Sequence, residues 1–83
     1  FPPLCPEFVV ELLSDSDSIF TLKDKMTEWM DNGCKLAWLI DTDKKNVYIY
    51  RKGKPVEILA GLKRTLSGED VLLGFKLNLK DIE

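Results

Sequence analysis

Two side chains of opposite charge, Glu11 and Lys25, have types and positions that could do chemistry. Glu11 interrupts the otherwise apolar segment FVVELL (Phe8–Leu13). A carboxylate in a buried strand is costly unless it is neutral, paired or bound to a cation. One interpretation is a strand-end or edge residue that reaches solvent, or a plain ion pair with Lys25. The other is a ligand of a hard cation such as Mg²⁺, which prefers carboxylate oxygens and keeps waters, one of which can become a nucleophile.

Lys25 also has two interpretations. A lysine on a helix is commonly solvated and without a catalytic role. Lys25, however, borders the apolar stripe of a predicted helix, so it can bury its stem and send its ammonium towards the neighbouring strand. In phosphodiester hydrolysis, such a cation orients the attacking water and stabilises the charge that develops on the phosphate.

A third candidate is a scatter of basic residues in the turns after residue 43: Lys44, Lys45, Arg51, Lys52, Lys54, Lys63 and Arg64. They could follow a phosphate backbone beside Tyr48 or Tyr50. They could equally be charged turns that keep a sheet edge soluble. The interleaved acids Asp41, Asp43 and Glu57 favour the second interpretation.

The elements that must position these residues can be predicted from periodicity. A helix is expected over residues 19–32, with Asp17 or Ser18 as its N-cap and Asn32-Gly33 as its stop. Its apolar residues fall on one stripe: Ile19, Leu22, Met26, Trp29 and Met30. By the period of two, Glu11 shares a face of its strand with Val9 and Leu13.

Strands are expected over residues 8–13, 36–40 (LAWLI), 47–51 (VYIYR), 56–59 and 75–79, and a loop over residues 60–74. The fold class is α/β: one mixed β-sheet layer in a single domain, with the helix crossing over between the first two strands. One helix covers only one face of a sheet, so the other face should be bare. We therefore expect a homo-oligomer through the uncovered face, or a missing segment that covers it.

The composition limits the function further. The chain has 83 residues, with 45% hydrophobic and 31% charged residues, as in a globular domain, and a net charge of -2 that gives no global attraction to nucleic acid. It has no His and no Gly-rich phosphate loop, which excludes classical protease, kinase and dehydrogenase sites. No apolar run is long enough to span a membrane. Cys5 and Cys34 are expected to be reduced thiols of a cytoplasmic protein.

Two long segments carry a resemblance to a known family: CPEFVVELLSDSDSIFTLKDKMTEWMDNGCKLAWLIDTDKKNVYIYRKG, and then LSGEDVLLGFKLNL. They resemble the C-terminal half of a large bacterial family catalogued as restriction endonucleases and long known as a domain of unknown function. The family pattern reads PDFVVEL-S-PSD, a helix with a lysine before an apolar residue, NG, LGWLID, VxIYR and LSGEDVLPGF. Glu7, Asp15 and Leu73 depart from this pattern.

The family is similar to the PD-(D/E)xK nucleases, which cut DNA with Mg²⁺, so the resemblance implies a partial restriction-endonuclease-like core. It implies that Glu11 is the metal-binding acid of the (D/E)xK half-motif. Leu13 occupies the position where a lysine would stand, and Lys25 matches the helix lysine thought to replace it.

The resemblance also implies that the other metal-binding acid, an Asp, lies on a strand upstream of Phe1. Residues 1–83 would then be the C-terminal portion of a longer Mg²⁺-dependent DNA endonuclease, inactive alone. The alternative is a non-catalytic module on the same scaffold that binds DNA or dimerises.

Overall fold

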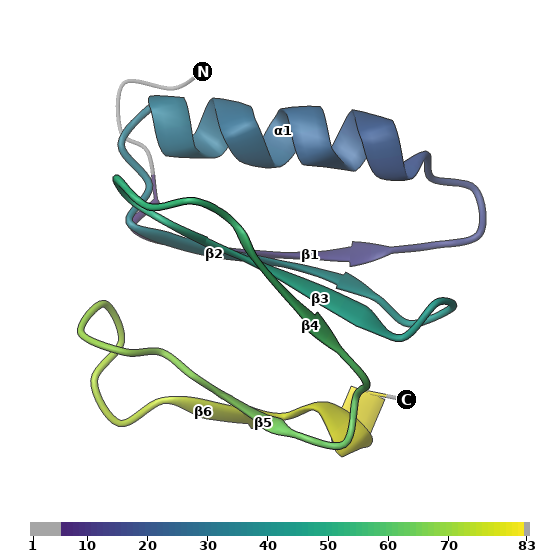
Figure 1. Cartoon of the computed structure of the whole chain (residues 1–83). Coiled ribbons are helices and arrows are strands. Elements are labelled where there is room, and N and C mark those ends of the chain that lie inside the picture. The colour runs from purple at the N-terminus through teal and green to yellow at the C-terminus, as the bar shows by residue number, and fades with distance from the viewer. Residues whose placement is uncertain (1–5, 83) are drawn as a thin grey trace.

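The computed structural model describes residues 6–82, which fold into six strands, one α-helix and a short 3-10 helix (Figure 1). In chain order the elements are β1 (Phe8–Leu13), α1 (Ile19–Asp31), β2 (Leu36–Asp41), β3 (Asn46–Arg51), β4 (Glu57–Ala60), β5 (Thr65–Ser67), β6 (Lys76–Asn78) and η1 (Leu79–Ile82).

The main sheet is four-stranded, in the order β1-β2-β3-β4. β1 and β2 are parallel and joined by the crossover helix α1, whereas β3 and β4 continue as an antiparallel meander. This confirms the predicted α/β fold. β2 is buried along its whole length, as its continuous apolar sequence predicts.

α1 forms where the sequence places its caps and its apolar stripe. The Ser18 Oγ accepts a hydrogen bond from the Thr21 backbone N–H at 3.4 Å, and Gly33 has a φ of 103°, which suits glycine after a helix. Leu22 and Met26 are buried against one face of the sheet, where they meet Ala37 and its neighbours. The helix therefore covers one face of the sheet, as predicted.

The opposite face is not bare, so the prediction of an uncovered face is wrong. Leu62, Leu66 and Leu79, all from the last third of the chain, are buried against β2 and β3. Burying a side chain of this kind contributes about 1.5–3 kcal/mol. The chain covers its own sheet, which removes the reason for expecting a homo-oligomer through that face.

The covering layer is a second, two-stranded sheet of β5 and β6 (Figure 1). Residues 60–74 are therefore not all loop, and the last strand does not extend the main sheet. Gly61, with a φ of 92°, turns the chain directly after β4, and its N–H donates to the Lys45 carbonyl at 2.7 Å. A lone hairpin is only marginally stable in water, so packing on the sheet stabilises it.

The cysteine prediction is addressed only in part. Cys34 is buried, and its Sγ donates to the Leu36 carbonyl at 3.3 Å. Cys5 lies outside the described residues. Within residues 6–82 no helix is long and apolar enough to cross a membrane.

Candidate active site

Glu11 lies on β1, at one edge of the main sheet as described. Its neighbour across the parallel pair is Leu39, and its same-face neighbours Val9 and Leu13 pack in the core beneath α1. Glu11 therefore faces the helix, as the period of two predicts. The strand places the carboxylate at the border between this core and the outer side of β1.

Lys25 of α1 reaches this carboxylate. Its Nζ lies 3.2 Å from the Glu11 Oε1, and the exposed fractions are 47% for the lysine side chain and 24% for the glutamate. Lys25 is itself exposed, whereas the adjacent Met26 is fully buried in the core beneath α1. The structure brings the two predicted site residues together.

The pair is charged and partly solvated, which decides what it can do. An ion pair this exposed contributes at most about 1 kcal/mol to stability. It offers an oxygen ligand or a proton acceptor beside a fixed positive charge. These are the groups that phosphodiester hydrolysis uses, as acceptor and as stabiliser of phosphate charge.

The turn between β1 and α1 adds a second carboxylate near the pair. Asp17 Oδ2 accepts hydrogen bonds from the Ser14 N–H at 3.0 Å and from the Ser14 Oγ at 2.8 Å. These bonds, and more weakly the charge of Lys25, hold the pKa of Asp17 below its usual value. Asp17 therefore stays ionised beside the site.

The donor set for a metal ion is incomplete within residues 6–82. No group of three or more His, Cys, Asp or Glu side chains gathers there. The predicted metal ligand Glu11 supplies one carboxylate, and this carboxylate already pairs with Lys25. Mg²⁺ in such sites is held by one or two carboxylates together with waters and substrate phosphates, so these residues would supply only part of a Mg²⁺ site.

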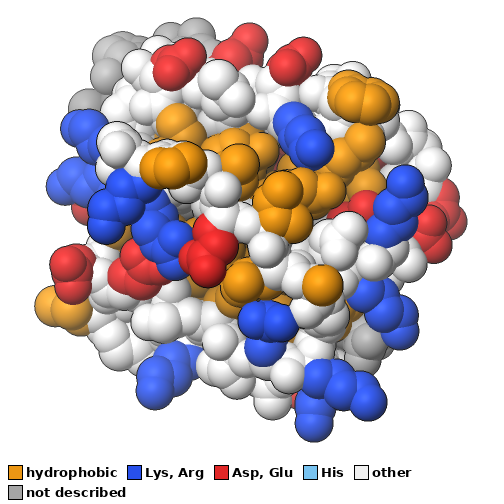
Figure 2. All heavy atoms as spheres, viewed as in Figure 1, with side chains coloured by type: hydrophobic (Ala, Val, Ile, Leu, Met, Phe, Trp, Pro, Cys, Tyr) orange, Lys and Arg blue, Asp and Glu red, His pale blue; other side chains and the backbone are white. Residues whose placement is uncertain are grey.

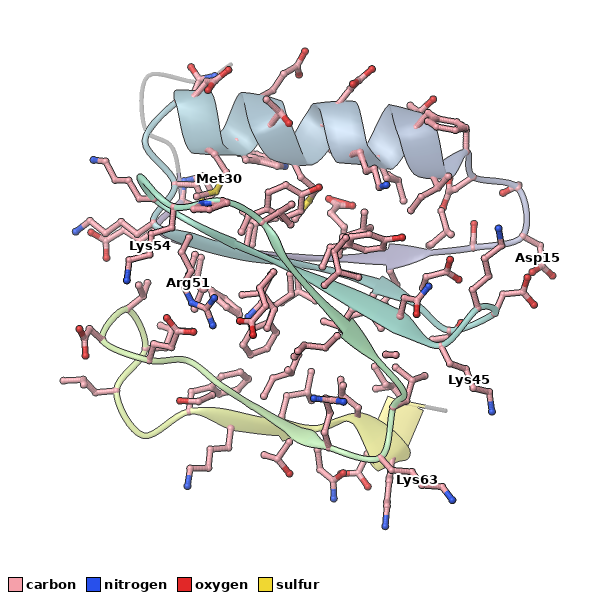
Figure 3. All side chains as sticks on the ribbon, viewed as in Figure 1. Asp15, Met30, Lys45, Arg51, Lys54 and Lys63 are labelled. Atoms are coloured by element: carbon pink, nitrogen blue, oxygen red, sulfur yellow. The ribbon has the colours of Figure 1, made fainter. Side chains whose placement is uncertain are left out.

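The basic residues do not form one track. The side chains of Lys45 and Lys63 lie at one end of the molecule and that of Lys54 at the other (Figure 3). Arg64 donates to the Ala60 carbonyl at 2.7 Å, which places it against the end of β4. Figure 2 shows a patch of hydrophobic side chains between α1 and β4, with basic side chains around it.

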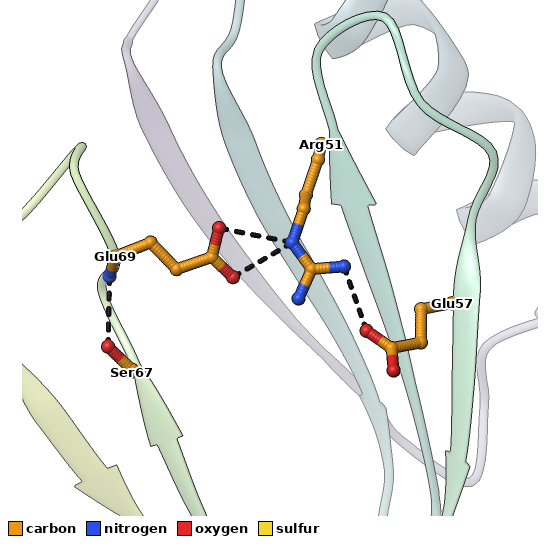
Figure 4. A network of polar contacts seen from close by, with 4 residues as sticks. All are labelled: Arg51, Glu57, Ser67 and Glu69. Carbon is orange, nitrogen blue, oxygen red and sulfur yellow. Dashed lines mark hydrogen bonds and ion pairs between the residues drawn. The ribbon is translucent and has the colours of Figure 1, made fainter.

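Arg51 has a structural role. Its Nε donates to both carboxylate oxygens of Glu69, at 3.0 and 2.9 Å, and its Nη1 donates to Glu57 at 2.8 Å (Figure 4). The hydrogen bond with Glu57, followed by the contacts with Glu69, raises the pKa of Arg51 against the opposing effect of burial. The side chain ties β3 to β4 and to the loop after β5.

Sequence reasoning missed two features of α1. Phe20 is 76% exposed at the start of α1, and Lys23 holds its ammonium 4.7 Å from the centre of the Tyr48 ring. Phe20 could have been noticed, because it is apolar but lies off the buried stripe of the helix. The contact between Lys23 and Tyr48 depends on tertiary packing and has no local signal.

The fold is similar to a solved structure. It is a crystal structure described as a putative nuclease belonging to DUF820, from Anabaena variabilis ATCC 29413. The TM-score is 0.77 at 22% sequence identity, over 92% of this chain and 42% of that chain. This chain thus spans less than half the length of that relative. No curated protein matches it.

The family assignment rests on the sequence. The model of the Uma2 family, described as putative restriction endonuclease, matches residues 1–80, which is nearly the whole chain. The chain therefore belongs to the Uma2 family of putative restriction endonucleases.

Proposed function

We propose that this chain contributes Glu11 and Lys25 to the active site of a DNA endonuclease that hydrolyses phosphodiester bonds. The observation that carries the proposal is the 3.2 Å pairing of these two side chains, from separate elements, in a chain of a restriction endonuclease family. One further feature supports it: the pair is partly solvated, so a substrate can reach it.

In this proposal each side chain has a defined task. The ammonium of Lys25 stabilises the negative charge that grows on the phosphate oxygens as water adds to phosphorus. Glu11 supplies a carboxylate oxygen as one metal ligand. The remaining donors would come from other residues of the full-length protein, outside these 83. Mg²⁺ would supply charge stabilisation and a more acidic water. Because one carboxylate is too few, these 83 residues alone are expected not to cut DNA.

The test is plasmid cleavage by the full-length protein in the presence of Mg²⁺. Glu11→Ala and Lys25→Ala should each lower the cutting rate by about a hundredfold or more, since each removes a group that acts on the transition state. The matched control is Lys35→Ala, because Lys35 also pairs with a glutamate, Glu7, at 3.0 Å on the surface. That variant should cut like the parent.

Equal cutting by all four proteins would exclude the assignment of both residues. Absence of cutting by the parent, with DNA still bound, would instead support a non-catalytic DNA-binding module on a nuclease-like scaffold.

A further inference from the structure

The helix side of the main sheet is only partly covered. An α-helix with its side chains is about 10 Å across and neighbouring strands lie about 4.8 Å apart, so one helix covers about two of four strands. Among residues 6–82, the core beneath α1 takes side chains from β1, β2 and β3 and none from β4. The fold therefore has an open step beside α1, with β4 as its floor.

The floor of this step is apolar. Ile58 of β4 pairs across the sheet with Tyr48, which belongs to the core beneath α1, so both side chains lie on the helix side. Val56, two residues earlier, shares this face by the period of two. Ile58 is 58% exposed and Val56 41%, and Figure 2 shows hydrophobic side chains gathered between α1 and β4. An apolar patch with a polar border is typical of a contact surface.

Lysines border the step. The ammonium of Lys23, on α1, lies 4.7 Å from the centre of the Tyr48 ring. Lys52 and Lys54 are exposed in the turn between β3 and β4, and they line a hollow of about 300 Å³ between this turn and the end of α1. One acid, Asp31, lines the same hollow, so the border keeps an excess of positive charge. An apolar floor with a basic border fits an apolar side chain that is flanked by carboxylates.

The outer face of α1 carries this opposite pattern. Phe20, Asp24 and Glu28 recur at every fourth residue, so they form one row along the helix. The row lies away from Leu22 and Met26, the buried residues of α1. Phe20 is 76% exposed and borders a cavity at the end of β1, and both acids are exposed. Figure 2 shows acidic side chains along this outer side of α1, at the top of the view.

Two copies of the chain can use both surfaces at once. Because the step lies directly beside α1, a two-fold axis that runs along the helix between them would place the helix of each copy in the step of the other. Such a contact uses the same surface on both copies and closes as a dimer. Phe20 of one copy would then meet Ile58 of the other. The acids of its row would meet Lys52 and Lys54, and opposite charges favour this pairing over other orientations.

We infer that the step beside α1 is an interface with a second copy of this chain, which inserts the row of Phe20, Asp24 and Glu28. The inference concerns assembly and is independent of the roles proposed for Glu11 and Lys25. That pair joins α1 to β1, at the other edge of the sheet from β4. A dimer through the step therefore leaves the pair open to substrate.

The first test measures self-association of the full-length protein by sedimentation equilibrium. The parent should form dimers, and Ile58→Glu should raise the dissociation constant by at least about tenfold, because it places a charge in the centre of an apolar contact. The matched control is Leu73→Glu, which alters another highly exposed apolar side chain, 83% exposed, in the loop before β6. This variant should associate like the parent.

The second test exchanges the charges of the two surfaces. One variant carries Asp24→Lys and Glu28→Lys, and the other carries the reversed turn. In that second variant the changes are Lys52→Glu and Lys54→Glu. Each variant alone should associate at least about tenfold more weakly, since like charges then meet in both halves of the interface. An equimolar mixture should form mixed dimers as tight as the parent, since each half again pairs opposite charges. Lys76→Glu, at an exposed lysine of β6, should have no effect.

Three results would overturn the inference: a parent that stays monomeric, an Ile58→Glu variant that associates like the parent, or exchanged variants that do not combine. If Ile58→Glu fails to fold, as judged by tryptophan fluorescence, the charge exchange still decides. The nuclease proposal is read separately, from cutting by the Glu11 and Lys25 variants in Mg²⁺. Loss of cutting there with no change in self-association would support the pair and leave the interface intact.

Discussion

The Glu11–Lys25 pair and the Arg51 network both join a cationic side chain to carboxylates, but they differ in how firmly the cation is held. Lys25 meets one carboxylate at 3.2 Å, and its side chain remains 47% exposed. Arg51 is 27% exposed and is held by two carboxylates, from β4 and from the loop after β5. A charge fixed from two sides stabilises a fold. A charge fixed from one side can still act on a ligand.

The two regions also differ in how much protein surrounds them. The Arg51 network joins two strands of the main sheet to the loop after β5, so its cation is fixed by two separate segments (Figure 4). The Glu11–Lys25 pair joins β1 to α1 and remains partly solvated. Packing, more than residue type, separates a structural ion pair from a candidate site.

The largest stability effect is expected from removing the central cation of the network. Arg51→Met should lower the free energy of unfolding by about 2 kcal/mol, because it removes charge-assisted hydrogen bonds to two glutamates. Lys25→Met should lower it by less than about 1 kcal/mol, because that pair is half solvated. Urea denaturation followed by tryptophan fluorescence measures both. Equal losses would erase the distinction between the two regions.

The next largest loss of stability is expected in the loop that carries Glu69, which pairs with Arg51. A Cβ added at Gly68 would lie 2.5 Å from the Leu72 carbonyl oxygen and 2.8 Å from the Leu72 Cβ, so the backbone must shift. Gly68→Ala should therefore destabilise the protein by about 1–2 kcal/mol. Gly53→Ala is the control for added bulk at a glycine, since nothing lies within 4 Å of its Cβ.

The control glycine has a positive φ of 73°, so Gly53→Ala carries a backbone cost of its own. The diagnostic result is a difference in hydrogen exchange. Gly68→Ala should speed exchange at the Gly68 and Leu72 amides, which donate to Phe75 and Gly68 carbonyls. Unchanged exchange there would contradict the close packing of this loop.

The smallest effect is expected in the turn beside the candidate site. Hydrogen bonds from Ser14 lower the pKa of Asp17 in the folded protein, so the ionised form stabilises the fold. This contribution is fully present above the ordinary aspartate pKa of about 3.9 and is lost as the pH falls through the lowered folded-state value. Asp17→Asn should slightly lower the thermal midpoint at pH 7 and have no effect near the acid limit. A difference that persists at low pH would contradict this origin.

Much of the fold could be predicted from local patterns. The buried strand LAWLI, the amphipathic stripe of α1 and the caps at Ser18 and Gly33 all depend on residues near one another, so each local signal was correct. β4 begins one residue later than the predicted strand at residue 56, the usual error at an element boundary.

The covering hairpin could not be predicted in the same way. β5 has three residues, too few for a period of two to be recognised, whereas its partner β6 lies within the strand predicted over residues 75–79. Whether such strands extend the main sheet or fold under it is decided by long-range contacts, here those of Leu62, Leu66 and Leu79.

The sequence by itself determined the family, the α/β pattern, and Glu11 and Lys25 as the residues to examine, because motif order and periodicity are local properties. Only the tertiary structure decided that the second face of the sheet is covered, that Arg51 is a structural cation, and that Phe20 borders a cavity. Each of these depends on which distant segments meet, and burial and packing are settled only when they do.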